Sequence, residues 1–308
     1  MIFLRERIGK LLRDLEGLIY TDETPVSGFR YVQSAEKFPD VSKVNTDDWA
    51  YCDRYPMSWG GHRAYYWFET FVTIPEEMDG QCVVYEQTTG KEDGWDATNP
   101  QFTIYVNNVL KQGLDINHRE VLLTEHAKAG ERYRIMLSAF TGDHNMNLVL
   151  DARIKVLHRE TEKYYYDLKM PYDTACLLRE SDTEYRDIIL NLNESLNLLD
   201  LRKPYSEAYE KSLKAAQDYL DQEFYERYAG VARQKVYCVG HTHIDVAWKW
   251  TLAVTEDKAV RSFSTVLELM RQYLEYKFMS SQPQLYKYVK KNAPQVYEEI
   301  KERVKEGR

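Results

Sequence analysis

The expected fold is decided by one stretch of the sequence, Val236-Tyr237-Cys238-Val239-Gly240-His241-Thr242-His243-Ile244-Asp245-Val246-Ala247-Trp248-Lys249-Trp250. Its first residues form an apolar run of strand character, and this run stops at Gly240. In α/β proteins, the loop that leaves the carboxyl end of a parallel strand is where ligands and metal ions gather. We therefore expect a strand over residues 235–239 that delivers polar side chains to a site.

Three of these polar side chains have the character of metal ligands. If residues 240–246 remain extended, positions two apart point the same way, so His241, His243 and Asp245 share one side. Imidazole nitrogen and carboxylate oxygen suit a borderline cation such as Zn²⁺. The period does not decide which two of the three bind. A hydrogen-bonded loop end without a metal is the plain structural alternative.

Length and composition limit the class of protein. At 308 residues the chain exceeds a usual single core, so two or more domains are expected. The net charge of −8 argues against a nucleic acid or an anionic membrane as partner. The four cysteines form no CxxC pair and the N-terminus is charged too early for a signal peptide. We therefore expect reduced thiols and a cytoplasmic protein.

The hydrophobic period divides the chain into four parts. Residues 1–24 contain an expected N-terminal helix, residues 25–160 a β-sandwich domain, and residues 161–233 a helical linker. Residues 234–308 read as the start of an α/β catalytic domain, with strands at 235–239 and 276–280 and helices at 256–274 and 283–304, the last disturbed at Pro294. Such strands should be parallel. Two parallel strands cannot cover their own faces, so we expect this barrel-like domain to be incomplete and the chain to be part of a longer polypeptide.

The β part shows a period of two. Strands are expected at residues 64–74, 82–87, 102–106, 132–140 and 147–156. Asn107-Asn108 should form a tight hairpin turn, because Asn tolerates positive φ. The pattern favours an antiparallel sandwich of jelly-roll rather than immunoglobulin type. A scaffold role is favoured over sugar binding, for which the candidate aromatic residues are Trp49, Trp59, Trp67 and Trp95, with Trp67 expected in the core.

The helical linker carries start and stop signals. Ser181-x-x-Glu184 has the form of a capping box, and Lys203-Pro204 should end the helix that follows it. Ser206 should cap the next helix, which should stop at Gly230. No residue of this part points to chemistry.

Residues 240–250 resemble the metal motif of glycoside hydrolase family 38, the zinc-dependent retaining α-mannosidases, and most closely its cytosolic and bacterial branch. Three other segments agree with that branch: Gln112-Gly113-Leu114-Asp115-Ile116-Asn117-His118-Arg119-Glu120-Val121-Leu122-Leu123, Arg261-Ser262-Phe263-Ser264-Thr265 and Ser280-Ser281-Gln282-Pro283-Gln284-Leu285-Tyr286. The resemblance therefore spans the sandwich, the linker and the opening of the catalytic domain. Its specific part is the His-x-Asp-x-x-Trp core.

The resemblance implies a role for each residue of this motif. His243 and Asp245 would be zinc ligands, His241 would orient them, and Trp248 would pack on the sugar, whereas Trp250 has no family role and is expected in the core or at a rim. A further His and the nucleophilic Asp would lie beyond residue 308, so this chain would hold no catalytic residue. The resemblance implies an inactive N-terminal part of an enzyme that cleaves terminal α-mannosyl residues of oligosaccharides. Zn²⁺ is the expected cofactor, with Co²⁺ or another divalent ion left open, as are the linkage and a homo-oligomeric state.

Other classes of protein share parts of the pattern. His-x-His-x-Asp also opens metallo-β-lactamase-like hydrolases, but those continue with another His, and this chain has Val246. Amidohydrolase-like enzymes place His-x-His after their first barrel strand, usually near the N-terminus, and leave Ala247-Trp248-Lys249-Trp250 unexplained. A carbohydrate-binding module without catalysis is the non-enzymatic alternative. Glycan binding without zinc would favour that module.

Overall fold

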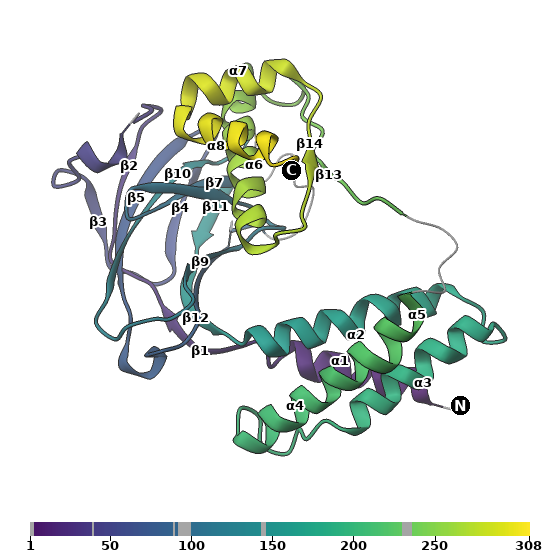
Figure 1. Cartoon of the computed structure of the whole chain (residues 1–308). Coiled ribbons are helices and arrows are strands. Elements are labelled where there is room, and N and C mark those ends of the chain that lie inside the picture. Colours follow the sequence, from purple (N-terminus) through teal and green to yellow (C-terminus); the bar gives the residue numbers. More distant parts are fainter. Residues whose placement is uncertain (1–2, 39, 89, 92–99, 143–145, 230–235) are drawn as a thin grey trace. The chain divides into compact units, whose positions relative to one another are not determined.

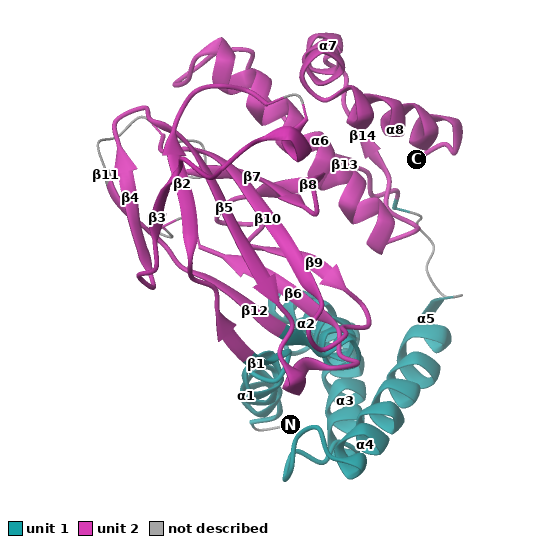
Figure 2. Ribbon diagram, turned by 90° about the vertical axis from the view of Figure 1, so that its left-hand side faces the viewer, with its two compact units in different colours: residues 1–22, 156–236 teal, residues 23–155, 237–308 magenta. Residues whose placement is uncertain are grey.

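The computed structural model describes residues 3–38, 40–88, 90–91, 100–142, 146–229 and 236–308. By internal contacts the chain forms two compact units, residues 1–22 with 156–236 and residues 23–155 with 237–308 (Figure 2). This grouping cuts across the four expected parts, because residues 1–22 group with the later helices and residues 237–308 group with the strands. The domain boundaries drawn from the sequence stay a prediction. No helix among the described residues is both long and apolar enough to cross a bilayer.

The first unit is helical (Figure 1). Its helices are α1 (Leu4–Glu16), α2 (Arg159–Leu177), α3 (Thr183–Asn197) and α4 (Glu207–Tyr219), followed by the π-helix η4 (Leu220–Glu226) and α5 (Arg227–Ala229). Their apolar stripes meet in one interior, where Ile8, Leu168, Leu192 and Leu213 are at most 3% exposed. The expected amphipathic N-terminal helix is therefore confirmed, and it is a packing element of this unit.

The expected helix caps in this unit have different outcomes. The capping box was wrong: α3 has Asp182 at its N-cap, its side chain makes no capping bond, and its carboxylate instead accepts from the Arg179 side chain at 3.2 Å. The Ser206 cap is confirmed, since its hydroxyl accepts from the Tyr209 backbone N–H at 3.3 Å. The expected stop at Gly230 lies outside the described residues.

The second unit contains most of the strands. A four-stranded sheet has the order β1 (Tyr20–Pro25), β12 (Ala152–Leu157), β6 (Val83–Gln87), β9 (Glu120–Thr124). A six-stranded sheet has the order β3 (Ala50–Cys52), β2 (Phe29–Gln33), β5 (Tyr65–Thr73), β10 (Arg132–Phe140), β7 (Gln101–Val106), β8 (Val109–Leu114). A two-stranded sheet pairs β11 (Met146–Leu150) with β4 (Met57–Gly61). The antiparallel β structure is confirmed, whereas the jelly-roll arrangement stays a prediction.

A turn and a strand boundary of the β part have different outcomes. Asn107 and Asn108 have φ of 49° and 71° and join β7 to β8, so the expected tight turn is confirmed. The single strand expected at residues 147–156 was wrong, because β11 and β12 belong to different sheets and part at Asp151. Both Arg153 and Tyr55 donate to the Asp151 carboxylate. Alternation continues through Asp151, so the period of two does not show the change of sheet.

Residues 237–308 follow the expected order of strand, helix, strand, helix. The elements are β13 (Gly240–His241), α6 (Leu252–Gln272), β14 (Phe278–Met279), α7 (Pro283–Asn292) and α8 (Pro294–Lys305). β13 and β14 are parallel, as expected, and pair Gly240 with Phe278 and His241 with Met279. The expected break at Pro294 separates α7 from α8.

The strand expected at residues 235–239 was wrong in its position. β13 contains only Gly240 and His241, while Val236 and Val239 are 80% and 51% exposed, and Lys235 lies outside the described residues. Among the described residues β13 has one neighbour, β14, and a strand extends only as far as its backbone finds a partner. The barrel-like continuation stays a prediction.

Candidate functional site

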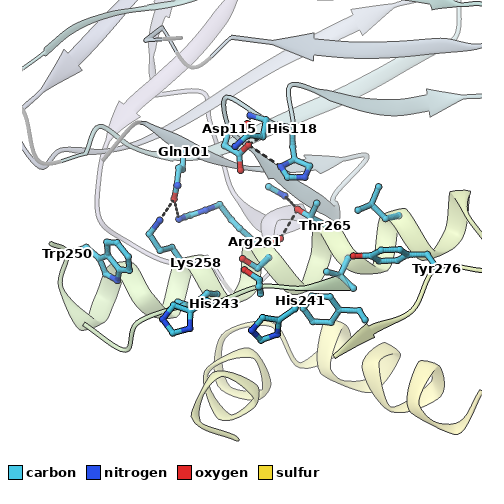
Figure 3. Close-up of a pocket in the computed structure, with 18 residues that line it drawn as sticks. Gln101, Asp115, His118, His241, His243, Trp250, Lys258, Arg261, Thr265 and Tyr276 are labelled. Carbon is cyan, nitrogen blue, oxygen red and sulfur yellow. Dashed lines mark hydrogen bonds and ion pairs between the residues drawn. The ribbon is translucent and has the colours of Figure 1, made fainter. Parts of the chain in front are cut away.

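A cavity of about 380 Å³ lies between the end of β8 and the segment that follows β13, within the second compact unit (Figure 3). This volume is within the range of small-molecule sites. Strand β7 and the turn after β8 contribute Gln101, Asp115, Asn117 and His118. The segment from β13 to β14 contributes His241, His243, Trp250, Lys258, Arg261 and Tyr276. The cavity therefore joins two segments that lie far apart in the sequence.

A close approach of α6 to β8 builds this cavity. The backbone N–H of Gly113 donates to the Thr265 hydroxyl at 3.0 Å, and that hydroxyl donates to the Arg261 carbonyl at 2.8 Å. A Cβ at position 113 would meet the Cβ of Arg261 at 2.9 Å, closer than real side chains come. Glycine is thus required where the helix crosses the strand. These residues belong to two of the segments that carried the resemblance, and the fold brings the two segments into contact.

His243 and Asp245 lie together at the carboxyl end of β13. The Nε2 atom of His243 is 3.1 Å from Oδ1 of Asp245, and their side chains are 73% and 44% exposed. Ile244 between them is 4% exposed and packs into the core, so the expected alternation holds. The imidazole and the carboxylate thus lie together and are exposed to solvent, and they supply nitrogen and oxygen ligands of the kind that Zn²⁺ prefers. No group of three or more His, Cys, Asp and Glu suited to a metal ion occurs among the described residues.

His241 is turned toward the neighbouring strand. Its Nδ1 is 2.9 Å from the carbonyl oxygen of Met279 in β14, and because a carbonyl only accepts, Nδ1 carries the proton. Such a bond fixes the tautomer and the orientation of the ring. Both His241 and His243 line the cavity, whereas Asp245 does not line it and contacts His243.

The two tryptophans of the motif differ in their surroundings. Trp248 is 50% exposed and does not line the cavity, whereas Trp250 does. The indole N–H of Trp250 donates to the hydroxyl of Thr255 at 3.0 Å, and that hydroxyl donates to the Val246 carbonyl at 2.9 Å. Thr255 is fully buried, so Trp250 is held by a fixed group. The sequence placed Trp250 in the core or at a rim without a role in the site, and the signal for its contact is a hydroxyl residue five positions later at the start of a helix.

The turn after β8 brings a carboxylate and an imidazole to the cavity. Oδ1 of Asp115 accepts from the backbone N–H groups of Asn117 and His118, both at 2.8 Å, and lies 3.1 Å from Nδ1 of His118. Burial by itself would raise the pKa of Asp115, but the bonds from the His118 ring and the two backbone N–H groups outweigh it and lower that pKa. This turn lies in a segment that supported the resemblance, but sequence reasoning gave its residues no role.

Strand β7 also contacts α6 at the cavity. The side-chain oxygen of Gln101 accepts from Lys258 at 3.2 Å and from Arg261. Arg261 is only 9% exposed, and the ammonium of Lys258 lies 4.6 Å from the centre of the Trp250 ring. The amide of Gln101 therefore fixes two cationic side chains of α6 along one wall.

The aromatic residues proposed for sugar binding on the sandwich are not exposed where they are described. Trp59 and Trp67 are 7% and 3% exposed, so Trp67 belongs to the core as expected. Trp49 packs against the cluster that contains Trp67, and Trp95 lies outside the described residues. These side chains favour a scaffold role for the interior of the sheets.

Comparisons with known proteins find glycosyl hydrolases and alpha-mannosidases. Residues 233–308 match the model of the glycosyl hydrolases family 38 N-terminal domain. Alpha-mannosidase G of Dictyostelium discoideum is 26% identical over 330 aligned positions, which cover 99% of this chain and 28% of that protein. Human alpha-mannosidase 2C1 is 27% identical and covers 77% of this chain and 23% of that protein. The chain thus spans between a fifth and a third of the length of these two relatives.

Two further likenesses are shorter or more remote. An alpha-mannosidase of Saccharomyces cerevisiae is 38% identical over 76 residues, 25% of this chain and 7% of that protein. Among solved structures, a glycosyl hydrolase family 2 member from Bacteroides cellulosilyticus has a TM-score of 0.32 and 12% identity over 44% of this chain and 21% of that chain. The latter likeness adds nothing to the assignment.

Proposed function

We propose that this chain, whose residues 233–308 match the glycosyl hydrolases family 38 N-terminal domain, forms the N-terminal part of a zinc-dependent retaining α-mannosidase acting on terminal α-mannosyl residues of oligosaccharides. The observation that carries the proposal is the pair His243 and Asp245, whose Nε2 and Oδ1 atoms lie 3.1 Å apart. The pair follows a parallel strand, where α/β proteins gather their ligands.

The donors of this chain suit part of a zinc site. His243 and Asp245 would bind the ion, and His241 would hold the local backbone in place through its bond to the Met279 carbonyl. When bound, the ion would supply Lewis-acid polarisation and a template for the vicinal C2 and C3 hydroxyls of mannose. Zn²⁺ is the proposed ion, with Co²⁺ or another divalent ion as the alternative.

The proposal gives the residues of this chain binding and orienting roles only. Trp248, half exposed beside Trp250, would offer an aromatic face to the apolar C–H face of the sugar. A retaining glycosidase also needs a carboxylate nucleophile and a carboxylic acid about 5–5.5 Å apart. We assign neither group to a residue of this chain, so we propose that these 308 residues alone are inactive.

Two further features belong to the same proposal. We propose that residues 234–308 open a parallel α/β barrel-like domain, for which the parallel pair β13 and β14 and the crossover helix α6 are the support. A cytoplasmic location is supported by four cysteines that are all free thiols in the structure.

The deciding experiment is hydrolysis of 4-nitrophenyl α-mannoside by the full-length protein, with and without a chelator. We expect cleavage that the chelator abolishes and Zn²⁺ restores, with 4-nitrophenyl β-mannoside as the negative control. Cleavage that survives complete metal removal would contradict the zinc requirement. Cleavage of neither substrate by metal-loaded protein would contradict the mannosidase assignment.

A further inference from the structure

The cavity has a second wall that the proposed zinc site does not use. In Figure 3, Asp115 and His118 lie on one side of the cavity, and His241 and His243 lie on the other. The wall with Asp115 and His118 comes from a turn between β8 and β9, and the wall with His241 and His243 comes from β13 and the loop after it. A ligand held at His243 would therefore have a polar surface of the β part beside it.

The turn is preorganised for binding. Three hydrogen bonds to one oxygen of Asp115 fix the backbone of Asn117 and His118 and the plane of the His118 ring. The side chains of Asn117 and His118 are exposed although their backbone is fixed. A ligand would thus meet a backbone and a His118 ring whose ordering cost falls on folding and not on binding.

The chemical character of this wall suits a neutral, hydroxylated ligand. The amide of Asn117 offers a donor and an acceptor at one position, which matches a hydroxyl group. Lys258 adds a donor that Gln101 orients, and Trp250 adds an apolar surface held by Thr255. A few fixed polar groups beside aromatic surface are typical of small-molecule sites.

We propose that the turn from Asp115 to His118, with Lys258 and Trp250, is a subsite for the sugar next to the terminal mannose of an oligosaccharide. The inference rests on the proposed function, because that function places the terminal mannose at His243. Asn117 and His118 would contact hydroxyls of the second sugar, and Asp115 is a positioning residue that acts through His118. The β part would then help to select the substrate as well as support the fold.

The first test measures the binding of sugars to the 308-residue chain by saturation-transfer NMR in the presence of a chelator. The probes are methyl α-mannoside and the α-1,2-, α-1,3- and α-1,6-linked mannobioses. We expect transfer to at least one disaccharide, and a signal at least several-fold weaker in Asn117→Ala and His118→Ala. The matched control is His126→Ala, an exposed histidine of the same β part outside the cavity, which should bind as the wild type does.

The second test uses the full-length protein and compares kcat/KM for the best-bound mannobiose with kcat/KM for 4-nitrophenyl α-mannoside. Loss of one polar contact should lower the ratio by about 10-fold in His118→Ala, which corresponds to about 1.4 kcal/mol. Asp115→Asn should lower it less, because Asn still accepts the backbone bonds. An unchanged ratio in both Asn117→Ala and His118→Ala would overturn the subsite.

The two proposals fail in different ways. If the full-length protein cleaves no mannoside but the chain binds a disaccharide in a His118-dependent manner, the subsite stands and the mannosidase assignment falls. If cleavage is zinc-dependent but the saturation-transfer signal of the disaccharides is absent, or is equal in the wild type, Asn117→Ala and His118→Ala, the mannosidase assignment stands and the subsite is overturned.

Discussion

The alternation of side chains in an extended segment brings His243 and Asp245 together. Two positions apart in an extended segment, with Ile244 buried between them, they point to one side. Local sequence is sufficient to bring these two side chains together, and their role as metal ligands stays a prediction. Trp250 was expected only in the core or at a rim, because its place at the cavity depends on a contact with Thr255 that no period describes.

Loss of either proposed ligand should be more severe than loss of His241. In the full-length protein, His243→Ala or Asp245→Ala should abolish zinc retention and α-mannoside cleavage. His241→Ala should lower zinc affinity or activity by about 10–100-fold, as for groups that only orient ligands. Zinc content by atomic spectroscopy and hydrolysis of 4-nitrophenyl α-mannoside measure both effects. Near-wild-type activity after either ligand change would refute the site, and complete zinc loss in His241→Ala would make that residue a ligand.

Asp115 should give the second unit a pH-dependent stability. A lowered pKa in the folded state means that the carboxylate stabilises the fold above its unfolded pKa of about 3.9. This stabilisation is lost as the pH falls through the folded pKa. Asp115→Asn should therefore lower the free energy of unfolding by about 1 kcal/mol at neutral pH, and the difference should close as the pH falls below about 4.

Urea unfolding followed by tryptophan fluorescence at a series of pH values measures this difference. The control is Asp47→Asn, since the Asp47 side chain is 82% exposed and its ion pair with Arg30 is a surface contact. A difference between wild type and Asp115→Asn that stays constant with pH would contradict the prediction.

At the scale of elements, the contact of α6 with β8 positions the cavity. This contact depends on Gly113, because a side chain there meets the base of Arg261 and not its flexible end. The junction also shares a core, in which Leu110 of β8 packs with Phe263 and Leu267 of α6. The helix that follows the proposed ligands is therefore fixed by the β part.

Gly113→Ala should destabilise the second unit by about 1–3 kcal/mol, as overpacking does. The control is Gly17→Ala at the end of α1, where a Cβ would find its nearest neighbour at 3.5 Å, an ordinary contact. Urea unfolding of the two variants measures the effect. Equal stability of Gly113→Ala and wild type would mean that α6 is not held closely against β8.

The strands show what the sequence could and could not reveal. Residues 132–140 were foreseen as a strand because alternation of buried and exposed side chains is local, and β10 has these bounds. The same alternation does not name the partner strand, so the change of sheet at Asp151 was missed. The turn at Asp115 was missed as part of the site for a related reason: the fold places it in the same cavity as His243, whereas spacing describes only neighbours in sequence.

At the scale of the whole molecule, the chain consists of two units whose segments alternate in the sequence. The sequence indicated helical and β parts but not that residues 1–22 would group with residues 156–236. That grouping arises from apolar stripes on α1, α2 and α3, and a stripe does not specify which other stripe will cover it.

The unfolding of the two units should be distinguishable by two spectroscopic signals. All six tryptophans, at positions 49, 59, 67, 95, 248 and 250, belong to the second unit, so fluorescence follows that unit alone, whereas far-UV circular dichroism follows both. Leu192→Ala in the first unit should cost about 2–5 kcal/mol and shift only the dichroism transition. Leu137→Ala in the second unit should shift the fluorescence transition. Both side chains are fully buried.

Coincident transitions in the wild type and in both variants would show instead that the two units unfold as one cooperative body.

The exposed run before β13 has a practical consequence for anyone who handles this chain. Val236 and Val239 are 80% and 51% exposed beside a strand that, among the described residues, pairs only with β14. Apolar side chains next to an open strand edge promote self-association, which natural proteins suppress with lysine. In light scattering, concentrated Val239→Lys should therefore be more monodisperse than the wild type. The hydrogen bond from His241 to the Met279 carbonyl should be unchanged.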